Sequence, residues 1–352
     1  MSFKWMKSLA VIAVIGLGVT ISHSNVHAEA LESPYYNSNP KIVKVKSGIY
    51  SFKDVELKEK DKILRKGSYL HVKGVVETEK GTPRLQLTNG QYITANKQFI
   101  VKTKGYQNPK QYFQVQYEQI KPTGKVGYNL SRGYEGIKTW KVMRRLGIIG
   151  THGYAKYNNS TYYAVRNFQA KHKLPVTGNV DLKTWIKLGF SENSWYNIDN
   201  YIAPLKANGW DGRSEHIEAM IRQAYKYIGN PYIVGAASSP SYGLDCSGLV
   251  TQALYAGGIN PVPVSSIQHA HPGNEWNSRK LFASKQFKHV PYSQRQRGDL
   301  IFYYQPGTHT IWHVAIYLGN NKIIESWPTK VMISPVINSH CNVIAGVTRP
   351  FL

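Results

Sequence analysis

Residues 231–250 read PYIVGAASSPSYGLDCSGLV, and this stretch holds one of only two cysteines among the 352 residues. From Ser247 onward, apolar residues recur at helical spacing: Leu249, Val250, Ala253 and Leu254. The pattern predicts a helix with Cys246 at its N-terminus. Because unpaired backbone N–H groups and the helix dipole favour an anion there, we expect the pKa of Cys246 to be lowered. A thiol of this kind is a candidate nucleophile.

The second cysteine, Cys341, offers the alternative that the two thiols form a disulfide. An exported chain with an even cysteine count allows this. A disulfide would, however, consume the residue at the centre of the motif, whereas Cys341 lies in SHCNVIAG, which reads as a final strand. The sequence favours a free Cys246. Since Cys, His and Asp do not recur at ligand spacing, it predicts neither a metal site nor a cofactor.

A cysteine nucleophile needs a base, and His313 is the strongest candidate among the histidines that follow residue 212. The letters WHVAIYLG read as a strand that places His313, Ala315 and Tyr317 on one face. A strand holds a histidine rigidly, as a base requires. A lone strand histidine is nevertheless more often a packed or solvated residue, so spacing alone does not identify it.

The next strand, KIIESW, carries Glu325. If residues 319–321 form a three-residue loop, Ala315 pairs with Glu325 and His313 becomes its diagonal neighbour on the same face. Diagonal neighbours lie about 7–8 Å apart, within side-chain reach. A loop of even length would place His313 and Glu325 on opposite faces. A Cys–His–Glu arrangement therefore requires an odd loop.

Taken together, PYIVGAASSPSYGLDCSGLV, RGDLIFY and HVAIYLGNNKIIES resemble the NlpC-type papain-like peptidases of bacterial cell walls, from about 214 to 350. The resemblance implies Cys246 as nucleophile and His313 as base. The third position falls on Glu325, where the family more often has His, Asn or Gln. Three further residues match family positions that line the site, although each has a structural alternative: Tyr232, Asp245 and Ser247.

The first thirty residues are typical of an export signal. Lys4 and Lys7 precede an apolar run, and small residues follow it, with cleavage expected after Ala28 or Ala30. The run is shorter than the roughly 20 apolar residues that a spanning helix needs. We expect a secreted, wall-associated protein without a membrane span after cleavage.

Positive charge is concentrated in one part of the chain. Of the net charge of +24, residues 125–190 carry +10. Such a density indicates a polyanionic partner. For an exported protein, peptidoglycan and anionic wall polymers are better candidates than nucleic acid.

The chain divides into several segments. Residues 31–124 read as a small all-β module with a linker, loosely similar to Src-homology-3-like and S-layer-type wall modules; Asn89-Gly90 predicts a type I′ hairpin turn there. In 125–190, the letters TYYAVRNFQ and LPVTGNVDLKTWIKL resemble a three-helix peptidoglycan-binding domain. A polar linker is expected over 191–212, and an α+β papain-like cysteine peptidase domain over 213–352. The fold class is therefore multidomain.

The main functional hypothesis is a cysteine endopeptidase that cleaves the γ-D-glutamyl–diamino-acid bond of peptidoglycan stem peptides. The first alternative is an N-acetylmuramoyl-L-alanine amidase with a related Cys/His fold. Those amidases more often follow the cysteine with Thr and then an aromatic residue, whereas here Ser247 and Gly248 follow. The second alternative is a wall-binding protein without catalysis.

Overall fold

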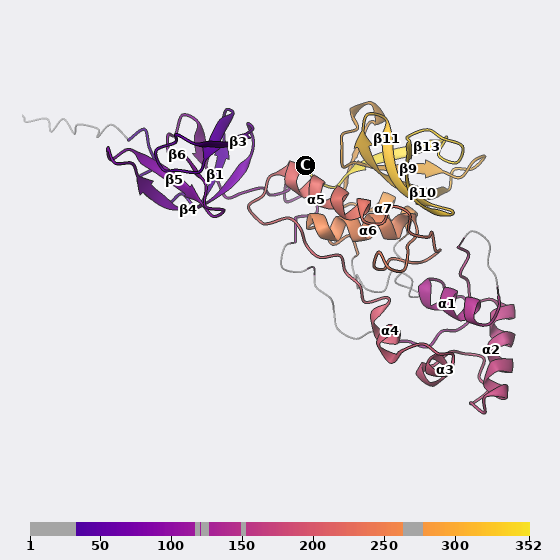
Figure 1. Cartoon of the computed structure of the whole chain (residues 1–352). Coiled ribbons are helices and arrows are strands. Elements are labelled where there is room, and N and C mark those ends of the chain that lie inside the picture. The colour runs from indigo at the N-terminus through magenta and orange to yellow at the C-terminus, as the bar shows by residue number, and fades with distance from the viewer. Residues whose placement is uncertain (1–32, 117–119, 121–126, 149–152, 263–276) are drawn as a thin grey trace, which may run out of the picture.

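The computed structural model describes residues 33–116, 120, 127–148, 153–262 and 277–352. Figure 1 shows a strand-rich N-terminal part, a helical middle part and a C-terminal part in which helices lie beside a sheet. The predicted export signal lies outside the described residues. Within those residues, no helix combines the length and the apolar character that crossing a membrane demands.

The N-terminal part is one antiparallel sheet of seven strands in the order β3-β2-β6-β5-β4-β1-β7. Alternating apolar residues of these strands form its core, for example Val43, Val72 and Leu85. The strands are β1 (Ile42–Val45), β2 (Ile49–Phe52), β3 (Lys60–Leu64), β4 (Tyr69–Glu77), β5 (Pro83–Leu87), β6 (Tyr92–Thr94) and β7 (Ile100–Lys102).

The turn between β5 and β6 differs from the predicted type I′ turn. Gly90 has a φ of 87°, but Asn89 does not have a positive φ. The N–H of Gly90 donates to Leu87 O at 3.0 Å, and the N–H of Leu87 donates to Gln91 O at 2.7 Å. This is a loop of three residues that ends in a left-handed glycine, the geometry of a type I turn followed by a bulge. The prediction of a hairpin holds, and the prediction of its turn type is wrong.

The helical part packs around the fully buried Trp185. Its indole N–H donates to Ser191 O at 3.0 Å and to Ser194 Oγ at 3.1 Å, which ties two successive helices together. Asp181 caps its helix by accepting from the N–H of Thr184 at 2.7 Å. The helices are α1 (Ile137–Arg145), α2 (Asn159–Lys171), α3 (Leu182–Lys187) and α4 (Glu192–Asn197).

The stretch 191–212, expected to be a linker, is instead packed along its length. It begins with α4, which Ser191 caps and whose Trp195 is buried against Trp185. Further on, the N–H of Ala203 donates to Gln252 Oε1 at 2.8 Å. The apolar residues of this stretch occur at irregular spacing, so their burial leaves no periodic signal in the sequence.

The C-terminal part combines helices with an antiparallel sheet of six strands in the order β12-β11-β10-β9-β13-β8. One face of the sheet packs against α5 and α6 through residues such as Val314 and Ile316. The other face carries Ala315, Tyr317 and Tyr303. The elements are α5 (Arg213–Tyr225), α6 (Cys246–Gly257), α7 (Ser278–Ala283), the short 3-10 helix η1 (Tyr292–Gln294), β8 (Lys288–Val290), β9 (Leu300–Tyr304), β10 (Ile311–Gly319), β11 (Lys322–Trp327), β12 (Lys330–Pro335) and β13 (Ile344–Arg349).

The helical part and the C-terminal part meet at residues 231–236, the segment before α6. The N–H of Gly136 donates to Val234 O at 3.0 Å, and the N–H of Val234 donates to Gly153 O at 3.1 Å. A Cβ on Gly153 would lie 1.9 Å from Tyr232 O, so only glycine permits this approach. Ile233 belongs to the core of the helical part. The segment that leads to Cys246 is therefore held by both parts of the molecule.

Candidate active site

Cys246 is the first residue of α6, as the sequence predicts. Asp245 caps this helix, because its Oδ1 accepts from the N–H of Gly248 at 2.8 Å and its Oδ2 accepts from the N–H of Gly235 at 2.9 Å. A Cβ on Gly248 would lie 2.1 Å from Ala236 O. Helix start and preceding loop therefore touch backbone to backbone, which fixes the position of the thiol.

The pKa of Cys246 is raised above its ordinary value, contrary to the expectation of a lowered one. Burial of the thiol is the main cause, and the neighbouring Asp245 carboxylate adds to it. The backbone N–H groups of Val314, Ser247 and Cys246 act in the opposite direction but are outweighed. Because the side chain is only 7% exposed, the helix N-terminus does not by itself yield a thiolate. A raised pKa favours the neutral thiol, so a base is needed to remove its proton.

His313 and Glu325 make the predicted contact, although the turn between their strands differs from the prediction. Gly319 pairs with Lys322, so only Asn320 and Asn321 form the turn, and both have positive φ. A register shift between Tyr317 and Gly319 adds one residue to β10. A two-residue turn alone would place His313 and Glu325 on opposite faces of the sheet. The extra residue of the bulge reverses this effect, and Ile316 pairs with Ile324 as the predicted register requires. His313 and Glu325 consequently share a face.

The two nitrogens of the His313 ring have different surroundings. Nε2 lies 2.7 Å from Glu325 Oε2 and donates to it, since a carboxylate can only accept. In the neutral ring Nδ1 is then the unprotonated nitrogen. It is buried without a hydrogen-bond partner among the described residues. The backbone N–H of the next residue, Val314, makes a hydrogen bond to the sulfur of Cys246. His313 is therefore the neighbour in sequence of a residue that contacts the thiol.

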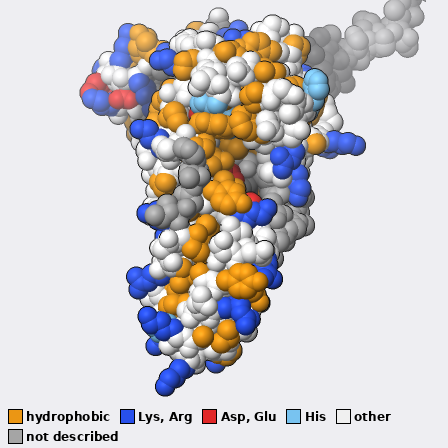
Figure 2. Space-filling view, turned by 90° about the vertical axis from the view of Figure 1, so that its right-hand side faces the viewer, with side chains coloured by type: hydrophobic (Ala, Val, Ile, Leu, Met, Phe, Trp, Pro, Cys, Tyr) orange, Lys and Arg blue, Asp and Glu red, His pale blue; other side chains and the backbone are white. Residues whose placement is uncertain are grey.

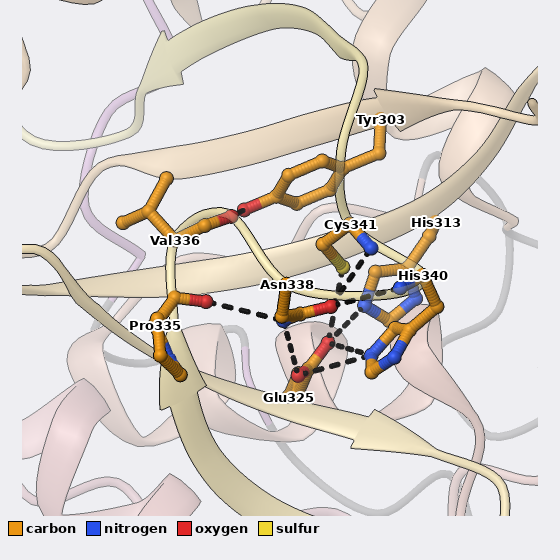
Figure 3. Close-up of polar contacts among 8 residues, drawn as sticks. All are labelled: Tyr303, His313, Glu325, Pro335, Val336, Asn338, His340 and Cys341. Carbon is orange, nitrogen blue, oxygen red and sulfur yellow. Dashed lines mark hydrogen bonds and ion pairs between the residues drawn. The ribbon is translucent and has the colours of Figure 1, made fainter.

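Glu325 is fully buried and accepts several hydrogen bonds (Figure 3). Besides His313, His340 Nε2 lies 3.2 Å from both carboxylate oxygens, and the Cys341 thiol donates to Oε2 at 3.3 Å. Burial raises the pKa of Glu325, but hydrogen bonding and charge from His313 outweigh it and hold the pKa at about 2. The carboxylate is therefore ionised at neutral pH and can stabilise a protonated His313.

A cavity of about 360 Å³ lies next to Cys246. Figure 2 shows a hollow on this side of the molecule between its upper and lower parts. Tyr232, Asp245 and Ser247 line the cavity together with Cys246. Asp245 and Ser247 also have a structural role, since the Ser247 hydroxyl donates to Asp245 Oδ1 at 2.9 Å beside the helix cap. His313 is fully buried and is not among the residues that line the cavity.

Further residues line the cavity that the sequence did not single out. Glu135 reaches it from the helical part, and Arg279 reaches it from α7. Trp312, which precedes His313, forms another part of the wall. The sequence could not identify them as cavity residues, because an isolated Glu, Arg or Trp outside a motif follows no recognisable spacing.

Both cysteines carry free thiols, so the prediction of a free Cys246 is confirmed. Cys341 does not lie in the final strand, which begins at Ile344. The ligand atoms of His313, Glu325 and Cys341 all lie within 4.8 Å of one another. These residues could hold a metal ion, an arrangement that the spacing along the chain did not predict. They come from β10, β11 and the segment before β13.

The C-terminal part thus combines a cysteine at a helix N-terminus with a strand histidine whose Nε2 is held by a carboxylate, the set of groups found in papain-like peptidases. Residues 229–344 match the NlpC/P60 family, and residues 145–188 match the putative peptidoglycan binding domain. Residues 35–100 match a domain of unknown function, DUF5776. The chain thus contains an NlpC/P60 domain together with a peptidoglycan-binding domain and a β-rich region. The resemblance to NlpC-type peptidoglycan peptidases is confirmed.

Curated relatives include the peptidoglycan endopeptidase RipA of Mycobacterium tuberculosis, 33% identical over 180 residues, which are 46% of this chain and 34% of RipA. The gamma-D-glutamyl-L-lysine dipeptidyl-peptidase of Bacillus subtilis is 30% identical over 110 residues, 31% of either chain. The aligned regions thus span about a third of each relative. Among solved structures, the peptidoglycan hydrolase RipB of Mycobacterium tuberculosis is 26% identical with a TM-score of 0.29, covering 55% of this chain and 82% of that one.

Proposed function

We propose that this protein is a secreted cysteine endopeptidase that hydrolyses the γ-D-glutamyl–diamino-acid bond of peptidoglycan stem peptides. The observation that carries the proposal is the His313 ring, whose Nε2 is held by Glu325 at 2.7 Å while Nδ1 is left as an acceptor. The next residue, Val314, contacts the Cys246 thiol through its backbone N–H. This arrangement suits proton transfer from a thiol to a rigidly held base.

In the proposed reaction, His313 Nδ1 takes the proton of Cys246 as the sulfur attacks the scissile carbonyl carbon. The ionised Glu325 stabilises the imidazolium that forms. Backbone N–H groups at the start of α6 are placed to stabilise the oxyanion. The imidazolium then gives its proton to the leaving amine, and a thioester remains on Cys246. Water, deprotonated by His313, hydrolyses the thioester and releases the thiol.

Charged groups in the cavity support this choice of bond. A γ-linked glutamyl residue keeps its α-carboxylate free, and the guanidinium of Arg279 on the cavity wall offers this anion a charge-assisted partner. The diamino acid carries an ammonium group, which Glu135 on the wall would attract. The name of the Bacillus subtilis relative also states a γ-D-glutamyl-L-lysine bond.

The helical part would hold the enzyme on its polymeric substrate. A groove of about 420 Å³ beside α1 is lined by Lys141, Arg144 and Arg145 together with aromatic residues such as Trp140. Figure 2 shows lysine and arginine side chains around the lower part of this face. Cations next to aromatic rings suit a glycan that carries anionic groups. Peptidoglycan and anionic wall polymers are thus the proposed partners.

The test is to digest purified cell-wall sacculi and to identify the new termini by mass spectrometry. The proposal predicts fragments that end in γ-D-glutamate, with a matching free amine on the diamino acid. New N-terminal L-alanine would instead support the amidase alternative. Unchanged walls, with binding retained, would support a non-catalytic wall-binding protein.

A further inference from the structure

Four side chains with metal-binding atoms converge in the C-terminal part: His313, Glu325, His340 and Cys341 (Figure 3). Glu325 Oε2 lies 2.7 Å from His313 Nε2, 3.2 Å from His340 Nε2 and 3.3 Å from Cys341 Sγ. We propose that Zn²⁺ binds to this group and inhibits the enzyme. The binding stands on the cluster alone, whereas the inhibition rests on the proposed function.

The distances are close to those of a tetrahedral zinc site. With zinc–ligand distances of about 2.0–2.3 Å, neighbouring ligand atoms lie about 3.3–3.8 Å apart. Here the ligand atoms of His313, Glu325 and Cys341 all lie within 4.8 Å of one another. Shifts of up to about 1 Å would therefore seat an ion where the hydrogen-bonding protons now lie.

The chemistry of the group favours zinc over harder cations. Imidazole, thiolate and a single carboxylate are ligands that Zn²⁺ prefers, whereas Mg²⁺ and Ca²⁺ require mainly oxygen. The carboxylate and the thiolate together supply two negative charges, which balance those of the ion. A neutral assembly is important because Glu325 and Cys341 are fully buried. His340, whose side chain is 18% exposed, connects the cluster with solvent.

Binding of Zn²⁺ would inhibit hydrolysis because it changes which nitrogen of His313 carries the proton. Zn²⁺ displaces the thiol proton of Cys341, which leaves to solvent. To bind through Nε2, the neutral rings of His313 and His340 must each carry their proton on Nδ1 instead. A protonated Nδ1 on His313 cannot accept the proton of Cys246. The ion thus disables the base without touching the nucleophile.

Cobalt spectroscopy on the full-length protein tests the site without relying on activity. In the Cys246→Ser variant, where Cys341 is the remaining thiol, Co²⁺ should give a thiolate-to-cobalt charge-transfer band and tetrahedral d–d bands. In Cys341→Ser, affinity for Co²⁺ and Zn²⁺ should fall by at least about 100-fold, since even a residue outside the ligand set costs 10–100-fold. A band that persists in Cys341→Ser and is missing from Cys246→Ser would overturn the proposal, because the metal would then bind the other thiol.

The inhibition is tested by a Zn²⁺ titration of wall hydrolysis. Cys341→Ser keeps an O–H donor for Glu325, and the inhibition of each protein is expressed relative to its own activity without metal. Zn²⁺ should inhibit the wild type reversibly, with recovery after chelation, and should inhibit Cys341→Ser only at concentrations at least about 100-fold higher. Equal inhibition of both proteins would overturn the proposal. A wild type that hydrolyses nothing would contradict the proposed function, while the cobalt spectra would still decide the site.

Discussion

The two oxygens of Glu325 receive hydrogen bonds from His313 of β10 and from His340 and Cys341 of the segment before β13. A carboxylate with a pKa of about 2 stays ionised next to His313 at neutral pH. It fixes the proton on Nε2 and stabilises the imidazolium. Glu325 is therefore expected to act through His313 and not on the substrate.

Replacement of Glu325 tests this role. Glu325→Ala should lower kcat/KM by roughly 10- to 1,000-fold, less than loss of Cys246 or His313, because the base remains but loses its orientation. Glu325→Gln should lose less, since it keeps an acceptor for the Nε2 proton. Initial rates on one defined stem peptide, with folding matched by circular dichroism, measure both. Full activity in Glu325→Ala would remove Glu325 from the site.

The thiol of Cys246 should respond to the charge of Asp245. Because that carboxylate raises the pKa of Cys246, Asp245→Asn should shift the pH profile of alkylation by iodoacetamide to lower pH, although burial keeps the pKa raised. The asparagine retains an acceptor for the helix cap. A Cys341→Ser background leaves Cys246 as the sole thiol, and circular dichroism checks the fold. An unchanged profile would contradict the electrostatic account.

At this scale the sequence identified Cys246, His313 and Glu325 as a group but not the residues around them. The contact between His313 and Glu325 was predicted from the alternation of side chains along the strands. The prediction assumed a three-residue loop, whereas the turn has two residues, and the bulge in β10 supplies the missing residue. His340 and Cys341 could not be placed, because the segment before β13 has no period that would fix where its side chains point. The effect of burial on the pKa of Cys246 depends on packing from other elements, which no local pattern reports.

Among the elements, the start of α6 depends on its close contact with the preceding loop. In Gly248→Ala the new Cβ would lie 2.1 Å from Ala236 O, so backbone must move. We expect a loss of about 1–3 kcal/mol in the free energy of unfolding and a larger loss of activity, since the movement displaces Cys246. Urea unfolding and peptide hydrolysis measure these effects.

Gly74→Ala provides the matched control, because the added Cβ would meet nothing within 4 Å and Gly74 has no positive φ. Its stability should stay within about 0.5 kcal/mol of the wild type. If Gly248→Ala behaved like this control, the close contact would not position the thiol.

The presence of a helix or strand was easier to predict than the residue at which it begins. The helix at Cys246 and the strands around His313 and Glu325 have strong periods, and the structure contains them. Helix starts have no such period: Asn158 caps α2 through its side chain, whereas Gly212 precedes α5 without a side-chain cap. Several Ser, Asn and Gly residues near a helix start can serve as caps, and tertiary packing selects among them.

For the whole molecule, segments expected to be linkers join the parts. Besides 191–212, the connection after β7 packs on the C-terminal part, where the N–H of Phe113 donates to Gln286 O at 3.1 Å. His71 of β4 stacks on Trp210 with ring centroids 4.4 Å apart. The sequence predicted the multidomain composition, whereas such contacts depend on the final arrangement (Figure 1).

Wall binding should depend on the basic groove of the helical part. Charge reversal at Lys141, Arg144 and Arg145 to Glu should weaken binding to sacculi strongly at low salt. Wild-type binding should itself fall as salt rises, because the Debye length shrinks from about 10 Å at 0.1 M to about 3 Å at 1 M. Pull-down with sacculi across a salt series measures both effects.

The same reversal at Lys62, Arg65 and Lys66, which are exposed in the N-terminal part, changes the net charge equally. This control should retain most of the binding. If the two triple variants weakened binding alike, total charge and not the groove would bind the wall. Binding that is indifferent to salt would point to stereospecific glycan contacts.

The central claim is that Cys246 attacks the substrate, and its most direct measurement is the initial rate of hydrolysis of one defined stem peptide by wild type and Cys246→Ala, with wall binding measured in parallel. The fold does not need the sulfur, so the variant should bind sacculi as the wild type does. Without the thiol, no covalent path remains, and hydrolysis should fall to background. A Cys246→Ala variant that still releases the γ-D-glutamyl product would contradict the account.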